Sequence, residues 1–270
     1  MTTHPRTLSD AAVAVLSTAD PVQKAQASRT AAADWRAGAI ATIGAALPPD
    51  RPSRPARPEL RRPGDMPKRG AGASPAGRIA LLHAIAHIEL NAIDLAWDLV
   101  ARFTGAALPR AFFDDWVQVG DEEAKHFALL ADRLADLGAA YGELPAHDGL
   151  WEAAAETAHD LLARLAVVPL VLEARGLDVT PAMIARMERF GDDRTAAALT
   201  TIYQDEIGHV AIGMRWFRFE CERRGVEAEP TWRALVAEHF RGALKPPFNE
   251  AARSAAGMPA AFYTREDVSR

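Results

Sequence analysis

The chain has 270 residues, 49% of them hydrophobic, which suits a globular protein with one large core and extensions. Its formal net charge of −5 gives no overall attraction to nucleic acid, and its single cysteine, Cys221, excludes an intramolecular disulfide and is expected in the core. We find neither a signal peptide nor an apolar run approaching the roughly 20 residues of a membrane span. We therefore expect a cytoplasmic protein without a membrane partner.

The sequence of residues 1–47 predicts a helical extension. Residues 8–17 and 21–44 are rich in alanine, and Asp20 followed by Pro21 has the form of an N-cap and a first helical residue. Packing against the outside of the main domain is the role that we expect for these helices.

Residues 48–77 predict an extended strap, because eight prolines recur there among arginines. The strap is locally basic, which suits either a phosphate-bearing substrate or RNA, or ion pairs with acidic groups of the main domain. The second interpretation is favoured, since a run of charge specifies little by itself.

The sequence of residues 78–225 predicts a four-helix bundle. The first helix starts near residue 75 and ends near 103, the second follows Pro109, the third begins at Trp151 and the fourth covers about 194–224. Pro169 and the stretch from Gly176 to Pro181 predict that the third helix is interrupted after Glu173 and resumes at Pro181. Residues 226–270 predict one more helix, near 231–243, and a rigid tail, for which surface packing is favoured over closure across the site.

One arrangement of polar residues occurs twice in these helices. It consists of a single glutamate and a later Glu-x-x-His pair. The two glutamates are 123 − 89 = 34 residues apart in the first copy and 206 − 173 = 33 residues apart in the second. Residues three apart lie on one face of an α-helix, so each pair can direct a carboxylate and an imidazole at one point. The six residues are Glu89, Glu123, His126, Glu173, Glu206 and His209.

Each Glu-x-x-His pair interrupts a stripe of apolar residues with steps of three and four, which places the pair in the core. Glu89 precedes the turn at Gly105 by 16 residues and Glu123 follows Pro109 by 14, so the two carboxylates should lie at similar heights on antiparallel helices. A single Glu or His on a helix is most often solvated. Four carboxylates and two imidazoles in a repeated arrangement instead predict a dinuclear metal site, as in carboxylate-bridged helix bundles.

Other polar residues near the six have less definite roles. We interpret His83 and His87 as structural or as support for the ligands, and His147 as a loop hydrogen-bonder. Asp94 and Asp98 are expected at the surface, with the orientation of a ligand histidine as the alternative. No catalytic residue is assigned. The residues that could support the site from outside the ligand set are Arg175, Tyr203 and Asp205.

The chain resembles, over nearly its whole length, a ferritin-like bacterial family that is filed as a domain of unknown function. The segments that carry the likeness are Ala86-His-Ile-Glu89, Asp121-Glu-Glu-Ala-Lys-His126, Tyr141-Gly, Pro145-Ala-His147-Asp-Gly-Leu-Trp151, Glu173-Ala-Arg-Gly-Leu177, Asp205-Glu-Ile-Gly-His209 and Lys245-Pro-Pro-Phe-Asn249. The resemblance implies an all-α, ferritin-like four-helix bundle with additional N- and C-terminal helices, and the same six metal ligands. More distantly, Glu173-Ala-Arg175 followed by Glu206 and His209 is similar to the di-iron tRNA hydroxylase family, which implies oxygen chemistry and leaves the substrate open.

The leading hypothesis is an O2-activating hydroxylase or oxidase with two iron ions, manganese or a mixed Mn/Fe pair being options. O2 would be the cosubstrate, with a small-molecule or modified-nucleoside substrate and an electron donor as partners. We expect a cavity for the substrate beside Glu173, Arg175 and residues 176–181. The alternatives are a ferroxidase or iron-handling protein, a tRNA-modifying hydroxylase, and a helical protein with a vestigial site. A homodimer is one option for its assembly.

Overall fold

The computed structural model describes residues 7–66 and 72–264. These residues form helices joined by loops, and the described ranges contain no β-strand, only one isolated bridge between Leu60 and Ala146. The prediction of an all-α protein is therefore confirmed. The chain separates into two compact units, Met1–Trp151 and Glu152–Arg270, each of which is described by itself. The four segments predicted from the sequence and the ferritin-like bundle stay predictions.

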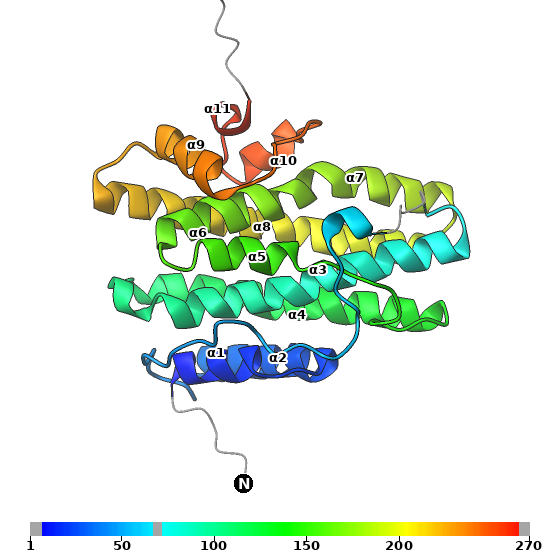
Figure 1. The fold of residues 1–270 in the computed structure, drawn as a ribbon, viewed down its shortest axis with the longest axis horizontal. Helices are drawn as coiled ribbons and strands as arrows, with labels where there is room; N and C mark the ends of the chain where they lie inside the picture. The colour runs from blue at the N-terminus through cyan, green and yellow to red at the C-terminus, as the bar shows by residue number, and fades with distance from the viewer. Residues whose placement is uncertain (1–6, 67–71, 265–270) are drawn as a thin grey trace, which may run out of the picture. The chain divides into compact units, whose positions relative to one another are not determined.

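Unit 1 is built around two long helices. Its elements are α1 (Leu8–Leu16), α2 (Pro21–Arg36), η1 (Pro63–Asp65), α3 (Pro75–Arg102), η2 (Thr104–Ala106) and α4 (Arg110–Asp136), followed by the start of α5 (Gly149–Glu156). The short connection through η2 folds α4 back along α3, and the two lie side by side, with α1 and α2 packed against them (Figure 1). α2 begins at Asp20 and Pro21 as expected, but it ends at Arg36 instead of residue 44 because Gly38 adopts a left-handed conformation, with φ 74°, just beyond its C-cap.

α3 is the central helix of unit 1. Every residue from Leu90 to Ala101 is buried, because α1 and α4 both pack against this helix. Its length and composition would allow it to cross a membrane, so the expectation that no segment is apolar enough was too strong. However, 67% of its most apolar window is buried inside the structure, as in the core helix of a globular domain.

A glycine fixes how closely α2, α3 and α4 approach one another. A Cβ atom on Gly120 of α4 would lie only 2.7 Å from Nε1 of Trp97 on α3. That indole nitrogen donates to Oγ of Ser28 on α2 at 2.7 Å, and the hydroxyl donates in turn to the carbonyl oxygen of Gly120 at 2.6 Å. The absence of a side chain at residue 120 thus lets one buried hydrogen-bonded chain join three helices.

The proline-rich strap runs over unit 1 without a long helix, as predicted, although residues 67–71, with Pro67, Lys68 and Arg69, lie outside the described residues. Several of its arginines are paired. Arg54 contacts Asp94 at 3.0 Å, and Arg51 contacts Asp148. These ion pairs agree with the favoured interpretation of the strap's charge.

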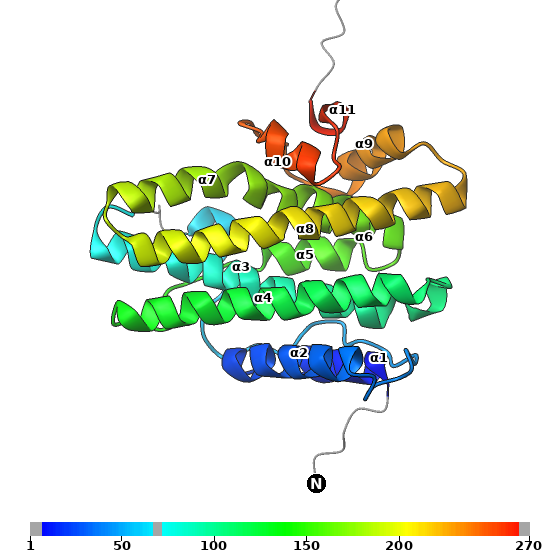
Figure 2. The ribbon, with the colours of Figure 1, turned by 180° about the vertical axis from the view of Figure 1, so that it is seen from behind.

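Unit 2 contains the rest of α5 and the C-terminal helices. They are α6 (Leu161–Val167), the π-helix η3 (Val168–Glu173), α7 (Ala174–Arg189), α8 (Asp193–Arg224), α9 (Ala228–His239), α10 (Glu250–Ala255) and α11 (Ala260–Tyr263). α7 and α8 run side by side, connected by a tight turn at Gly191, which has φ 68° (Figure 2). α8 ends at Arg224, before Gly225, as predicted; Gly225 is its C-cap in a left-handed conformation, and Cys221 is buried.

The predicted interruption after Glu173 is wrong. α7 continues through Gly176 and Pro181, and the irregular backbone lies earlier, in the break before α6 and in the π-helix that contains Pro169. A proline inside a helix leaves the carbonyl four residues earlier without its usual donor. Here that carbonyl belongs to Leu177, and the side chain of Asn249 donates to it at 3.1 Å. A segment far along the chain therefore allows the helix to continue.

The C-terminal segment packs on α7 and α8 within unit 2. Asn249 also donates to the hydroxyl of Tyr203 at 3.0 Å, and its backbone N–H donates to Asp178 at 2.9 Å. Arg253 binds the same aspartate through two nitrogens, at 2.9 and 2.7 Å, and is 2% exposed. The residues from 245 to 253 are thus fixed by buried polar contacts rather than by apolar packing alone.

Candidate metal centre

Three of the predicted ligands, all from unit 1, converge at one buried point. Glu89 is supplied by α3, whereas Glu123 and His126 are supplied by α4, and their exposed fractions are 4%, 0% and 0%. Nδ1 of His126 lies 3.2 Å from Oε2 of Glu89 and 3.3 Å from Oε2 of Glu123. The short α3–α4 connection and the i, i+3 spacing on α4 together produce this convergence.

This group has the chemistry of a metal site. One ligand atom from each of the three residues lies within 4.8 Å of the others, and the group could hold a metal ion. Two carboxylates and one imidazole are donors that iron and manganese accept in proteins. Two buried carboxylates this close would repel each other, so a bound cation would stabilise the arrangement. The residues present therefore fit a divalent metal ion.

Unit 2 carries the second Glu-x-x-His pair. Glu206 and His209 lie on α8 with exposed fractions of 8% and 0%, and Nδ1 of His209 is 3.6 Å from Oε1 of Glu206. Both interrupt an apolar stripe, as predicted, because their neighbours on the same face of α8, Leu199, Ile202, Gly213 and Phe217, are buried. The pair is thus buried, as its place in the stripe predicts.

The remaining predicted ligand, Glu173, is half-buried at the last residue of the π-helix η3, which packs against α8. That packing is close, since a Cβ atom on Gly213 of α8 would lie 2.4 Å from Cβ of Pro169 in η3. The structure brings together Glu89, Glu123 and His126 in unit 1, and Glu206 and His209 in unit 2. The complete ligand set, including Glu173, stays a prediction.

Two of the predicted supporting residues contact the C-terminal segment instead. Arg175 donates to the carbonyl oxygens of Lys245 and Pro247 at 2.6 and 3.2 Å, and Tyr203 accepts from Asn249. Asp205 is half-buried on α8. Arg175 and Tyr203 therefore fix the segment from 245 to 249 onto α7 and α8.

The predicted histidines of unit 1 hold a loop. Nδ1 of His87 lies 2.8 Å from the hydroxyl of Tyr141, and its Nε2 donates to the carbonyl oxygen of His147 at 3.0 Å. His83 accepts from the backbone N–H of Gly142 at 2.8 Å. Burial lowers the pKa of His87 to about 4, helped by the charge of Arg54, so its ring is neutral at pH 7. These contacts agree with a structural role.

Asp94 and Asp98 are not at the surface, which corrects the expectation from the sequence: both are 0% exposed. Asp94 pairs with Lys24 of α2 and with Arg54 of the strap, while Asp98 binds Arg102 at 2.7 Å. The buried cluster of Asp94 with Lys24 and Arg54 was not predicted from the sequence. The signal for it was that acidic residues recur in a helix that is otherwise almost entirely apolar, a place where a carboxylate needs a partner.

These observations define an all-helical protein with a buried carboxylate and imidazole group that could hold a metal ion. The chain belongs to the family described as "Protein of unknown function (DUF455)", whose model matches residues 17–264. It is similar to a protein of Haemophilus influenzae described as "Uncharacterized protein", with 43% identity over 209 residues that cover 76% of this chain and 72% of the relative. No solved structure matches it. The predicted membership in a family of unknown function is thus confirmed, whereas the ferritin-like and tRNA hydroxylase relationships stay predictions.

Proposed function

We propose that the protein is a dinuclear metalloenzyme in which the three ligands of unit 1 and Glu173, Glu206 and His209 of unit 2 bind two iron or manganese ions. The ligands would come from a ferritin-like four-helix bundle. Its reaction would be the O2-dependent hydroxylation or oxidation of an organic substrate.

The observation that carries the proposal is the convergence of Glu89, Glu123 and His126 in the core of unit 1. The repeat in the sequence extends it, because Glu206 and His209 have the same spacing on α8 and the same burial. Glu173 completes the repeat at the position that corresponds to Glu89. Four carboxylates and two imidazoles supply enough donors for two ions.

Each residue type has a distinct role in this proposal. The carboxylates would hold the ions and offset their charge, whereas His126 and His209 would each supply one imidazole nitrogen. Bound iron in its reduced state would supply electrons for the activation of O2. The buried apolar stripes around the ligands would exclude bulk water from the site.

The first test is the metal content of protein that is produced with iron. We expect close to two metal ions per chain, measured by elemental analysis of the folded protein. A folded preparation that carries no metal, and that takes up none from added ferrous or manganous salt, would contradict the proposal.

The second test separates oxidation of a substrate from oxidation of iron alone. We expect the reduced protein to consume O2 for only a few turnovers when no organic substrate is present. Sustained oxidation of many equivalents of added ferrous iron would instead identify a ferroxidase. An oxygen electrode together with the absorbance of ferric iron distinguishes the two outcomes.

A further inference from the structure

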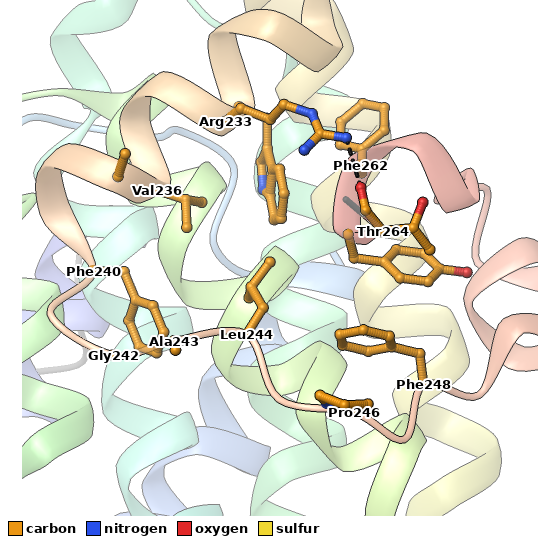
Figure 3. Close-up of a pocket in the computed structure, with 13 residues that line it drawn as sticks. Arg233, Val236, Phe240, Gly242, Ala243, Leu244, Pro246, Phe248, Phe262 and Thr264 are labelled. Carbon is orange, nitrogen blue, oxygen red and sulfur yellow. Dashed lines mark hydrogen bonds between the residues drawn. The ribbon is translucent and has the colours of Figure 1, made fainter. Parts of the chain in front are cut away.

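Unit 2 contains an apolar cavity of about 800 Å3 that the metal ligands do not line. Phe240, Leu244 and Phe248 face it from the segment that follows α9, and Phe262 lies across from them on α11 (Figure 3). Trp232 of α9 also lines it. Its volume lies within the range of sites for small organic molecules, and aromatic walls suit an apolar ligand.

A smaller cavity of about 250 Å3 shares part of this wall, including Phe240, Leu244 and Phe248. It differs from the larger one in its charge, because Arg233 is the single charged residue among the described residues that line the larger cavity, and it is paired with Glu229 at 2.7 Å. Its charged lining residues are Arg175, Lys245, Arg253 and Asp178, three cations and one carboxylate, which gives 3 − 1 = 2 positive charges. This local excess occurs in a chain whose formal net charge is −5. The two cavities together therefore combine an apolar chamber with a positive end.

Two of these cations, Arg253 and Lys245, differ in whether contacts within the protein hold their charged groups in place. Arg253 is bound to Asp178 and lies under the rings of Phe248 and Tyr263, at 5.2 and 4.5 Å. Lys245 is exposed, and among the residues that the structure describes its ammonium group forms no ion pair. Lys245 is thus available to an added anion, whereas Arg253 is a fixed part of the wall.

We propose that these two cavities form a binding site for an amphipathic organic acid. Its apolar body occupies the larger cavity between α9 and α11, and its anionic group contacts Lys245 beside Arg175. The site lies within unit 2 and binds this ligand without needing a metal. If the proposed function also holds, the ligand is the substrate, because Val171 and Leu172 of the smaller cavity belong to the π-helix that ends at Glu173.

The charge requirement is tested with two fluorescent probes on the full chain. 1-Anilinonaphthalene-8-sulfonate has an aromatic body and an anionic group, whereas N-phenyl-1-naphthylamine has a similar body and no charge. We expect Lys245→Glu to weaken binding of the sulfonate roughly five- to tenfold, the effect of a partly exposed charge contact, and to leave the neutral probe unchanged. The matched control is Arg241→Glu, which reverses an exposed cation in the same segment that lines neither cavity. It should change neither affinity by more than about twofold.

The location is tested by a matched pair of substitutions on α9. Ala237 lines the larger cavity and Ala234, three residues earlier on the same helix, does not. We expect Ala237→Trp to reduce binding of both probes at least tenfold because the indole fills the chamber, and Ala234→Trp to leave binding unchanged. Circular dichroism and the unfolding temperature verify that each variant is folded.

Four results would overturn the inference. The first is sulfonate binding that Lys245→Glu and Arg241→Glu weaken equally, and the second is probe binding that survives Ala237→Trp. The third is binding that occurs only after residues 265–270 are removed, since the cavity would then belong to that segment. The fourth is absence of probe binding to protein that holds two metal ions, which would leave the proposed function intact. Probe binding by unaltered protein that takes up no added iron or manganese would instead support this inference and reject the proposed function.

Discussion

His126 and Leu130 lie one turn apart on α4 and are both 0% exposed. Substitutions at these two positions therefore distinguish the loss of a metal ligand from the loss of a packing residue. We expect His126→Ala to abolish metal binding and to retain the helical circular dichroism of the protein. Leu130→Ala should retain metal binding and lower the free energy of unfolding by about 2–5 kcal/mol, the usual cost of truncating a large core side chain. Urea unfolding and metal analysis measure both effects. If His126→Ala and Leu130→Ala lose the same amount of metal and the same free energy of unfolding, the buried imidazole of His126 has only a structural role.

The buried cluster around Asp94 predicts an asymmetry between its members. Burial raises the pKa of Asp94, and the charges of Arg54 and Lys24 oppose that effect. Asp94→Ala leaves two cations without their shared partner, so we expect a loss of roughly 3–5 kcal/mol in the free energy of unfolding. Lys24→Met leaves the Arg54–Asp94 pair in place and keeps an apolar stem, so its cost should be clearly smaller. Equal losses in urea unfolding would show that the Arg54–Asp94 pair, which Lys24→Met retains, contributes nothing to the free energy of unfolding.

The burial of Glu123 and His126 could be predicted from the sequence and the partners of Asp94 could not, for a physical reason. Glu123 and His126 are three residues apart on one helix, and their apolar neighbours at steps of three and four reveal burial from sequence alone. Asp94 depends on Lys24, which lies 70 residues earlier in the chain. No local pattern encodes such a contact, because it depends on how α2 packs in the folded unit.

At the scale of the element, α7 depends on Asn249. The side chain of Asn249 donates to the Leu177 carbonyl that Pro181 leaves without a helical donor. We expect Asn249→Ala to lower the free energy of unfolding by about 1–3 kcal/mol, since a buried acceptor loses its partner. In a Pro181→Ala background the helix regains its own hydrogen bond, so the same substitution should cost less. A double-mutant cycle measures the difference, and strictly additive effects would contradict this account.

The same contact explains why the predicted interruption of this helix was wrong. Gly176 and Pro181 disfavour a helix when only their own propensities are considered. The sequence from 176 to 181 contains no information that Asn249 will supply the missing donor. By contrast, the N-cap at Asp20 and the end of α8 at Arg224 were predicted correctly, because caps are satisfied by residues next to them in the chain.

At the scale of the whole molecule, the proposed function requires ligands from both compact units. Binding that occurs only in the folded chain stabilises it, by about 2.7 kcal/mol for each ion at a hundredfold excess over its Kd. For a chain of this size we expect the unfolding temperature to rise roughly 5–10 °C when iron or manganese is added to metal-free protein under reducing conditions. Differential scanning calorimetry measures the shift.

The decisive comparison is between the two halves of the ligand set. His126→Ala in unit 1 and His209→Ala in unit 2 should each remove most of the metal-dependent shift, because in the proposed site each substitution takes one donor from a ligand set that both units supply. Leu130→Ala is the control, since it lowers the unfolding temperature and should preserve the shift. If His209→Ala leaves the full shift in place, the metal is bound by unit 1 alone. The site would then be mononuclear, and the dinuclear function proposed for the chain would be rejected.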